Sequence, residues 1–414
     1  MENEIADDNL RLLTEHFEDG CKENCVQKLG VEIEHFIVDA QTRESISYYG
    51  PQGVEAVLRK IARFFPKQEI YAREHLIGMY NNDYSISLEP AGQIEISIAP
   101  KENISTIRQI YNSFLRILKP VLEEFDYRLV TLGYHPVSIV EDMPLIPKRR
   151  YEYMDAYFDE TGRCGIHMMR GTASTQVSID FCSEDDFVLK YRTAYLLAPA
   201  LKLLTDNTPI FEGEPYMKNM ARTYIWNNVD KDRCGMPPGL FDEDFGFRKY
   251  AEYLWNMPLI LIPGEMHATY TGRKTTKELY EQKPLQQEDI DHILSMCFCD
   301  VRLKHYIEIR VADSMPLKYV LGYVALIKGI FFRKENLTAL AEKYPVNQFM
   351  IEAATENLQI NGFQGDIYGQ SVKDFLEYVI NLAEECLGYG EKDYLLSMKK
   401  IVNREETLAK EHHD

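Results

Sequence analysis

Carboxylate side chains recur two residues apart in segments whose other positions are apolar. Glu32 and Glu34 alternate with Val31 and Ile33, and Glu95 lies in a second segment of this kind. Side chains two apart on a strand share one face and lie about 6.6 Å apart along the chain. Each segment therefore predicts a strand with one acidic face and one apolar face.

Polar side chains also share one face in the other alternating segments. Gln176 lies in the segment 175–181, and 301–311 carries acidic and basic side chains together. The members of that mixed set are Arg302, Lys304, Glu308 and Arg310. The alternation predicts strands over Gly30–Asp39, Asp83–Ala99 (with a bend at 90–92), Thr175–Phe181 and Val301–Val311.

Convergence of these strands in one sheet would crowd their acids together. Those acids are Glu32, Glu34, Glu89, Glu95 and Glu308. Crowded carboxylates repel one another unless a cation lies between them, and oxygen ligands select hard cations such as Mg²⁺ or Mn²⁺. Such cations also bind phosphate oxygens, which indicates a nucleoside triphosphate. The basic side chains of 301–311 would then stabilise a transferring phosphoryl group.

The alternative interpretation is that each polar face meets water, as in many antiparallel sheets. It explains one such strand more easily than all of them, because solvated faces rarely carry closely spaced acids on two strands and clustered cations on a third. The P-loop and Rossmann motifs are absent from the sequence, as are H-E-x-x-H and G-x-S-x-G. The sequence therefore favours nucleotide binding through metal ions and strand residues.

Composition limits the partners and the location that we expect. The formal net charge of the 414 residues is −19, which argues against a nucleic-acid partner because such partners need clustered Lys and Arg. No apolar stretch approaches the ~20 residues that span a bilayer, and Met1–Asp8 is too polar for a signal peptide. The eight cysteines are too sparse for a disulfide framework. We therefore expect a cytoplasmic protein with mostly reduced thiols and no membrane association.

Helical periodicity fills the intervals between the strands. The predicted helices cover 104–125, 183–206, 317–332, 371–386 and 394–412. Ser183 is the predicted N-cap of the second of these helices, and Pro199 is a predicted kink within it. Strands separated by long helices predict an α+β fold. Without a linker signal we expect a single domain over 1–414, with a core over about 30–330 and a helical part over about 335–414.

Seven sequence blocks combine these features in a fixed order. The blocks are Gly30–Phe36, Ser87–Pro100, Gly133–Pro136, Met143–Tyr151, Met168–Phe181, Arg222–Arg233 and Asp300–Asp313. Together they resemble the glutamate–cysteine ligases (gamma-glutamylcysteine synthetases) of the plant and proteobacterial type. Each block is moderately specific, and their joint order is highly specific.

The resemblance implies a glutamine-synthetase-like fold, in which a curved antiparallel sheet packed with helices forms an active-site funnel. It implies ATP-dependent joining of the γ-carboxylate of L-glutamate to the amine of L-cysteine, with ATP as co-substrate and Mg²⁺ (or Mn²⁺) as cofactor. The metal ligands that it implies are Glu32, Glu34, Glu89, Glu95, Gln176 and Glu308. We expect small-molecule partners only, and a monomer or a homodimer.

The resemblance also implies roles for basic side chains. Arg310 would stabilise the transferring phosphoryl group, and Arg302 and Lys304 would contact phosphate. The candidates for nucleotide binding are Lys148, Arg149, Arg150 and Lys304, although a solvated basic loop over 148–150 is the alternative. The candidates for substrate binding are Arg222, Trp226, Arg233, Arg170 and Thr172. Structural ion pairs are the alternative for the arginines of 222–233.

One block departs from the plant pattern. Plant members tend to have Arg-Thr-Cys-Thr-Val-Gln where this chain has Gly171 and Ala173 before Gln176. The plant redox-switch cysteines cannot be carried over residue by residue, so we expect no disulfide regulation. Two other functions remain open: a γ-glutamyl ligase that uses a different amine or amino acid, and a non-catalytic homologue that binds nucleotide or metal.

Overall fold

One large antiparallel sheet forms the centre of the molecule, which the computed structural model describes over residues 2–23, 26–264 and 268–411. Its strands follow the order β14-β15-β7-β1-β5-β4-β3-β2, and β6 pairs with β1. Their bounds are β1 Leu29–Asp39, β2 Glu69–Ala72, β3 His75–Tyr80, β4 Tyr84–Leu88, β5 Ile94–Lys101, β6 Tyr127–Val130, β7 Ser174–Ile179, β14 Val301–Leu303 and β15 Ile307–Asp313. This sheet and its helices confirm the predicted α+β fold class.

Short strands pair outside the large sheet. These pairs are β8 Ile210–Phe211 with β9 Glu214–Pro215, β10 Cys234–Gly235 with β13 Phe298–Cys299, β11 Leu261–Ile262 with β12 Thr269–Tyr270, and β16 Asp366–Ile367 with β17 Gln370–Ser371. The pair of β10 and β13 is parallel, and the other three pairs are antiparallel. Strands of two residues carry too little periodicity to be predicted from alternation.

The register of the large sheet places the predicted polar side chains on one face. Glu32 lies opposite Gln176 on β7, and Glu34 lies opposite Glu95 on β5. Of the residues of β1 that alternate with these acids, Leu29, Val31, Ile33 and Ile37 belong to the hydrophobic core. Because side chains alternate with a period of two, this register aligns the acids of neighbouring strands.

The strand predicted over 301–311 is a hairpin instead. β14 ends at Leu303, the chain turns through 304–306, and β15 begins at Ile307. Arg302 and Glu308 therefore lie opposite each other across the hairpin. The turn contains no Gly, Pro, Asn or Asp, so the uninterrupted alternation of the segment concealed it.

Helices fill both sides of the sheet. Their bounds are α1 Glu2–Glu18, α2 Val54–Ala62, α3 Ile104–Glu124, α4 Arg149–Thr161, α5 Glu184–Leu204, α6 Ala221–Asn227, α7 Phe247–Asn256, α8 Thr276–Tyr280, α9 Gln287–Ser295, α10 Leu317–Phe331, α11 Lys334–Lys343, α12 Gln348–Asn361, α13 Val372–Cys386, α14 Leu396–Arg404 and α15 Leu408–Glu411. The helices α3, α5, α10 and α13 match predicted ranges to within two residues at each end. Ser183 accepts a hydrogen bond from the Asp186 backbone N–H, which confirms the predicted N-cap of α5.

The last predicted helix, over 394–412, is interrupted. Lys392–Leu395 is a short 3₁₀ turn, and α14 ends at Arg404 before α15 begins at Leu408. Glu405 has a left-handed backbone with φ of 56°, a conformation that commonly ends a helix. The final residue of the predicted range, His412, lies outside the described residues.

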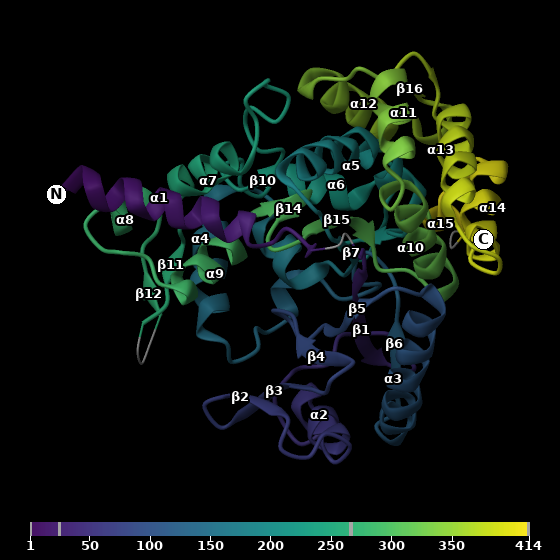
Figure 1. Cartoon of the computed structure of the whole chain (residues 1–414). Coiled ribbons are helices and arrows are strands. Elements are labelled where there is room, and N and C mark those ends of the chain that lie inside the picture. The colour runs from purple at the N-terminus through teal and green to yellow at the C-terminus, as the bar shows by residue number, and fades with distance from the viewer. Residues whose placement is uncertain (1, 24–25, 265–267, 412–414) are drawn as a thin grey trace.

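Segments far apart in the sequence share one core. Figure 1 shows α13, α14 and α15 together on one side of the molecule and α1 with α7, α8 and α9 on the other, with β14, β15, β7 and β1 between them. α1 packs against α7, and α10 packs against α13. A continuous cluster of buried apolar side chains extends from Leu10 in α1 to Leu408 in α15.

Two expectations from composition can be compared with the fold. None of the helices in the described part of the chain has the length and apolar character needed to cross a bilayer. Six described cysteines are free thiols, but Cys182 is disulfide-bonded. Cys182 is therefore an exception among the mostly reduced thiols that we expected, because cysteine pairing depends on proximity in the fold and not on spacing in the sequence.

Candidate active site

A cavity of about 240 Å³ lies over the polar face of the large sheet. The strands β1, β5 and β7 supply acids and an amide, while α4, α6 and the β14–β15 hairpin supply cations. The sequence-predicted residues that line it are Glu32, Glu34, Glu89, Glu95, Arg150, Thr172, Gln176, Arg222, Trp226, Arg302 and Arg310. The fold thus brings most of the predicted site into one place.

Glu34, Gln176 and Arg310 form a hydrogen-bonded chain across three strands. Gln176 Nε2 donates to Glu34 Oε1 at 3.2 Å, and Arg310 Nη1 donates to Gln176 Oε1 at 2.6 Å. Glu34 also accepts bonds from the backbone N–H and the hydroxyl of Ser174, at 2.7 and 2.8 Å. These contacts fix the orientation of the acid and the arginine before any ligand binds.

Burial and mutual repulsion raise the pKa values of the cavity acids. Removal from water, with repulsion by neighbouring glutamates, raises the pKa of Glu32 and of Glu95 to about 8. Burial and repulsion by Glu34 raise the pKa of Glu89 to about 7, and burial also raises the pKa of Glu34. Burial, aided by repulsion between the carboxylates, therefore opposes ionisation of these acids.

The donor atoms of the cavity fit a hard divalent cation. Carboxylate and amide oxygens are the ligands that Mg²⁺ and Mn²⁺ prefer, and no described His or Cys lines the cavity. A bound cation would also relieve the repulsion that raises the pKa values of the acids. Within the described residues, no group of three or more His, Cys, Asp or Glu side chains already has the spacing of a metal site. The acids thus supply the right chemistry without a preassembled coordination shell.

Glu308 differs from the other predicted metal ligands because it binds three cations of the chain. Arg302 Nη2, Lys304 Nζ and Arg310 Nη1 lie 2.6, 3.0 and 2.9 Å from its carboxylate oxygens. Burial opposes ionisation of Glu308, yet these cations hold its pKa well below the usual range. Neither Glu308 nor Lys304 lines the cavity. Both oxygens of Glu308 are engaged because the hairpin places it opposite Arg302.

Three buried donors on the cavity wall have no partner among the described residues. These donors are Arg222 Nη1, Trp226 Nε1 and Arg150 Nε. The Arg222 guanidinium lies over the Trp226 ring at 5.2 Å, and its Nη2 donates to the Arg310 carbonyl at 3.3 Å. A buried donor without a partner costs free energy. The wall therefore fits an anionic ligand such as a carboxylate or a phosphate.

Two predicted substrate contacts are structural ion pairs. Arg233 is fully buried, and its Nε lies 2.7 Å from Asp230. Arg170 pairs with Asp155 at 2.6 Å. Neither arginine lines the cavity. The prediction of substrate binding is corrected for both residues, because each guanidinium already has an acidic partner that sequence spacing did not reveal.

The predicted basic loop over 148–150 is the start of helix α4. Lys148 is its N-cap residue, and its Nζ donates to the Leu88 carbonyl at 2.9 Å. Arg149 Nε donates to the Tyr153 hydroxyl at 3.1 Å. Only Arg150 of these three basic residues lines the cavity. The predicted nucleotide contacts of Lys148 and Arg149 are therefore corrected, since both side chains are held elsewhere.

Other residues that line the cavity had no assigned role. They are Pro90, Gln93, Tyr151, Met154, Met168, Met169, Ser174, Ser295 and Phe298. Gln93 Nε2 donates to the carbonyls of Met169 and Thr172 and so ties the bend after Glu89 to the turn before β7. In the sequence, Gln93 lies two residues before Glu95, and this alternation could have predicted that Gln93 shares the polar face with Glu95. Phe298 lies on a strand of two residues, for which periodicity gives no signal.

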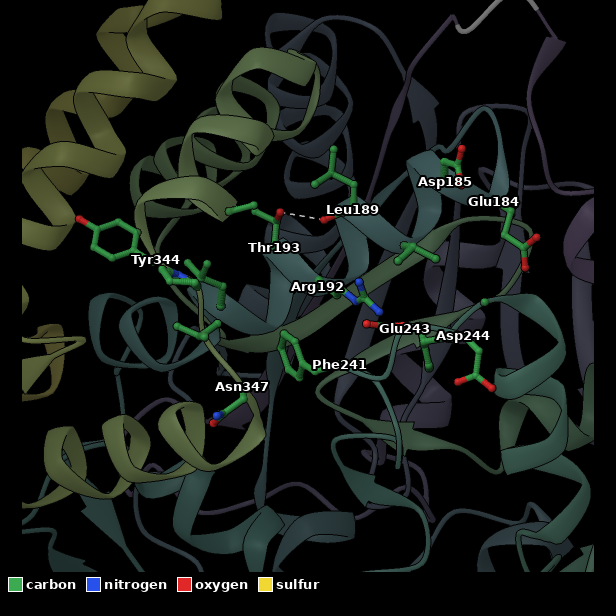
Figure 2. Close-up of a pocket in the computed structure, with 17 residues that line it drawn as sticks. Glu184, Asp185, Leu189, Arg192, Thr193, Phe241, Glu243, Asp244, Tyr344 and Asn347 are labelled. Atoms are coloured by element: carbon green, nitrogen blue, oxygen red, sulfur yellow. Dashed lines mark hydrogen bonds between the residues drawn. The ribbon is translucent and has the colours of Figure 1, made fainter.

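A larger cavity, of about 760 Å³, lies away from these residues. It is bounded by α5, by the segment 241–246 and by the segment 341–347. Figure 2 shows Glu184 and Asp185 at one end of this cavity and Arg192 on its wall. None of the sequence-predicted site residues lines it. Chemistry, and not volume, therefore identifies the smaller cavity as the candidate active site.

Comparisons with known proteins agree with this chemistry. A model of glutamate-cysteine ligase family 2 (GCS2) matches residues 28–361. A chloroplastic glutamate–cysteine ligase of Arabidopsis thaliana is 31% identical over 404 residues, which are 94% of this chain and 76% of the plant protein. The chloroplastic glutamate–cysteine ligase B of Oryza sativa subsp. japonica is 30% identical over 402 residues, with 94% and 80% covered.

A solved structure resembles the fold. It is a glutamate–cysteine ligase of Francisella tularensis in complex with AMP, with a TM-score of 0.54 at 12% identity over 91% of this chain and 82% of that chain. This likeness confirms the predicted glutamine-synthetase-like fold. The plant relatives are named chloroplastic, which contradicts the expected cytoplasmic location. That expectation failed because composition reports the absence of spanning segments and not the compartment.

Proposed function

Because this chain belongs to glutamate-cysteine ligase family 2, we propose that it joins the γ-carboxylate of L-glutamate to the amine of L-cysteine with ATP as the phosphoryl donor. The products are γ-glutamylcysteine, ADP and phosphate. A carboxylate is a poor electrophile, so it first accepts a phosphoryl group to form γ-glutamyl phosphate, and the amine then displaces phosphate. The observation that carries this proposal is one cavity in which clustered acids face fixed arginines.

The acids of the cavity hold the metal that the reaction needs. The proposed ligands are Glu32, Glu34, Glu89, Glu95 and Gln176, all of which line the cavity. Mg²⁺ held by these residues would neutralise the negative charge of the acids and of a triphosphate. The bonds from Ser174 and Gln176 keep Glu34 directed along the sheet face. Glu308 acts indirectly, since its carboxylate pairs with arginine and lysine side chains and not with the metal ion.

Arg302 and Arg310 stabilise the phosphoryl group during transfer. Both line the cavity, and both are held by the Glu308 carboxylate. Positive charge that is already in place needs no reorganisation as negative charge develops on the phosphoryl oxygens. Lys304 is held 3.0 Å from Glu308 and adds positive potential from outside the cavity wall.

Arg222 and Trp226 recognise a carboxylate of the amino-acid substrate. A guanidinium donates two parallel hydrogen bonds to a carboxylate, and Arg222 Nη1 is unpaired. Trp226 Nε1 is a second unpaired donor on the same wall. Thr172 donates its hydroxyl to the Met168 carbonyl at 2.7 Å, so its oxygen can only accept, as from a substrate amine.

A coupled assay tests this function directly. The purified protein is incubated with ATP, Mg²⁺ and L-glutamate, and phosphate release is measured with and without L-cysteine. We expect release to require all of the substrates, and mass spectrometry to detect γ-glutamylcysteine. A panel of other amines identifies a ligase with a different acceptor. Absence of glutamate-dependent phosphate release with every amine would contradict the ligase function and favour a non-catalytic homologue.

A further inference from the structure

A single buried glutamine joins two walls of the candidate active site. Gln93 ends the bend formed by residues 89–93, between the proposed metal ligands Glu89 and Glu95. Its Oε1 accepts a hydrogen bond from the Ala91 backbone N–H at 2.9 Å, and its carbonyl accepts one from the Glu89 backbone N–H at 2.9 Å. The bend therefore holds Glu89 and Gln93 together as one closed turn.

The amide nitrogen of Gln93 reaches a second turn across the cavity floor. It lies 3.2, 3.1 and 3.0 Å from the carbonyl oxygens of Met169, Arg170 and Thr172. These residues belong to the π-turn (His167–Gly171) or directly follow it. Turns of this kind are rare and occur frequently at functional sites. Two N–H groups of one amide are thus shared among three carbonyls of this segment.

Other carbonyls of the same segment have different donors. The Thr172 hydroxyl donates to the Met168 carbonyl at 2.7 Å, and the His135 backbone N–H donates to the Gly171 carbonyl at 2.9 Å. Neither donor belongs to the bend 89–93, whereas the Gln93 amide does. Replacement of that amide would leave three carbonyls without this donor, which costs free energy.

Both turns carry side chains that line the cavity. Glu89 and Glu95 supply carboxylates from one wall, while Met168, Met169 and Thr172 line another wall. Because each of these side chains moves with its backbone, the hydrogen bonds of Gln93 fix the separation of the acids from the second wall. A cation held by the acids would therefore order the π-turn as well as the bend.

We propose that Gln93 is a positioning residue that couples metal binding at Glu89 and Glu95 to the ordering of the π-turn, and so to the binding of the amino-acid substrate. Metal fixes the bend, the bend fixes the Gln93 amide, and the amide fixes the wall that carries Thr172. The inference rests on the proposed function for the identity of the substrate. Such coupling affects KM more than kcat, because both walls are already in place once metal and substrate are bound.

Two substitutions break the connection in different ways. Gln93→Met keeps the length of the side chain and removes both N–H groups. Gln93→Asn keeps the amide but is one methylene shorter, so it cannot bond the bend and the π-turn together. Gln348→Met removes an exposed hydrogen bond to Glu352 on α12, of 2.8 Å, and is the matched control. Melting temperatures establish that each variant is folded.

Hydrogen–deuterium exchange with Mg²⁺ as the only added ligand tests the coupling without catalysis. Full-length protein is labelled with a chelator or with excess Mg²⁺, and mass spectrometry follows the backbone amides of 167–172. We expect Mg²⁺ to slow their exchange about fivefold or more in the wild type and in Gln348→Met, and less than about twofold in both Gln93 variants. Equal protection in wild type and Gln93 variants, or no protection in the wild type, would overturn the proposal.

Steady-state kinetics supply the second measurement. We expect both Gln93 variants to raise the KM for L-glutamate about tenfold while kcat changes less than about threefold. A lower kcat with an unchanged KM would indicate loss of folded enzyme only and would also overturn the proposal. If the wild type forms no product with any amine, yet Mg²⁺ orders the π-turn only when Gln93 is present, the coupling holds and the proposed function fails. The two failures are therefore distinguishable.

Discussion

Single side chains in the cavity fall into two electrostatic groups. The arginines of the β14–β15 hairpin each pair with Glu308, at 2.6 and 2.9 Å. Glu32 and Glu95, on β1 and β5, have no ion-pair partner among the described residues, and burial raises their pKa values. This imbalance distinguishes a cavity prepared for a cation from an ordinary buried ion-pair network.

Replacement of Arg310 by Lys should impair catalysis more than binding. One nitrogen, Nη1, bonds both Gln176 and Glu308, which leaves the rest of the guanidinium for the phosphoryl group. A lysine side chain has one nitrogen, so it cannot bond Gln176 and Glu308 and also contact the phosphoryl group as a guanidinium can. We expect Arg310→Lys to lower kcat about 10²–10³-fold, measured as phosphate release at saturating substrates. Arg248→Lys, which alters an exposed pair with Glu252, is the matched control, and wild-type rates in both variants would remove the role of Arg310.

Glu34→Gln should abolish turnover and preserve the fold. Glutamine has the size of glutamate, and its one amide oxygen can still accept the bond from the Ser174 backbone N–H, which is 2.7 Å in the native protein. Its NH2 group can donate to the Ser174 hydroxyl in place of the bond that Glu34 accepts there at 2.8 Å. It cannot supply the negative charge that holds a divalent cation. We expect at least a 10²-fold loss of kcat that excess Mg²⁺ does not restore, with an unchanged melting temperature. Glu15→Gln, at an exposed pair, is the control, and recovery of activity at high Mg²⁺ would argue for weakened affinity instead.

Glu308→Gln should differ from Glu34→Gln because three cations lose their partner. Removal of one partner from a buried ion pair costs about 3–5 kcal/mol, and Glu308 is fully buried. We therefore expect a lower free energy of unfolding as well as a loss of kcat, measured by urea denaturation and phosphate release. A variant that is inactive but fully stable would instead support the sequence-based role of Glu308 as a metal ligand.

At the scale of elements, alternation along the chain was informative where a strand has one buried face. β1 and β7 were predicted for this reason, and their register then aligned Glu32 with Gln176. The turn over 304–306 was not predictable, because its residues continue the alternation. The partner of Arg170 was also hidden, since Asp155 approaches from a different helix. Alternation along the sequence thus predicted which side chains share a strand face. Contacts between separate elements decided which charged side chains are already paired within the protein.

The turn before β7 explains why this chain has Gly171 where plant members tend to have Arg. A Cβ atom at this position would lie 2.4 Å from the ring of Tyr134. Tyr134 is itself held by a hydrogen bond to Glu212, and its backbone bridges Thr172. The ring therefore occupies the space that a side chain would need.

Gly171→Ala should destabilise the protein through this contact. Overpacking costs about 1–3 kcal/mol, and Thr172 next to it lines the cavity, so we also expect a lower kcat/KM. Urea denaturation and initial rates measure the two effects. Gly388→Ala is the matched control, because a Cβ there meets nothing within 4 Å. Identical urea midpoints for the two variants would show that the Tyr134 ring moves aside at no cost.

At the scale of the whole molecule, a net charge of −19 opposes the approach of a polyanion such as ATP. Attraction must therefore come from local cations and from bound metal, whose fields act at short range in salt solution. The buried glutamates of the metal-free cavity also make the stability of the protein depend on pH. Its acids remain protonated in the folded protein at pH values where the unfolded chain has released those protons.

The metal-free protein should lose stability as the pH rises from 6.5 to 8.5. The folded pKa is about 8 for Glu32 and Glu95 and about 7 for Glu89, against an ordinary value of 4.5. The folded state thus binds more protons than the unfolded state, and the free energy of unfolding falls with pH by up to about 1.4 kcal/mol per unit for each proton. Histidines with lowered pKa values, about 4, are His16, His35 and His135. In the unfolded chain their ordinary pKa is 6.5, so they still bind protons near that pH, and their opposite effect offsets part of the fall at pH 6.5 and very little of it at pH 8.5.

Glu95→Gln isolates this effect, because it removes one proton-binding site and keeps the size of the side chain. Urea midpoints of both proteins are measured at pH 6.5, 7.5 and 8.5 in the presence of a chelator. We expect the midpoint of the variant to fall less steeply than that of the wild type. Excess Mg²⁺ should stabilise the wild type more at pH 8.5 than at pH 6.5, since metal binding displaces protons from its ligands. If the urea midpoints of the two proteins fell equally with pH, Glu95 would already be ionised at pH 6.5. The cavity would then need no metal ion to stabilise the charged form of Glu95.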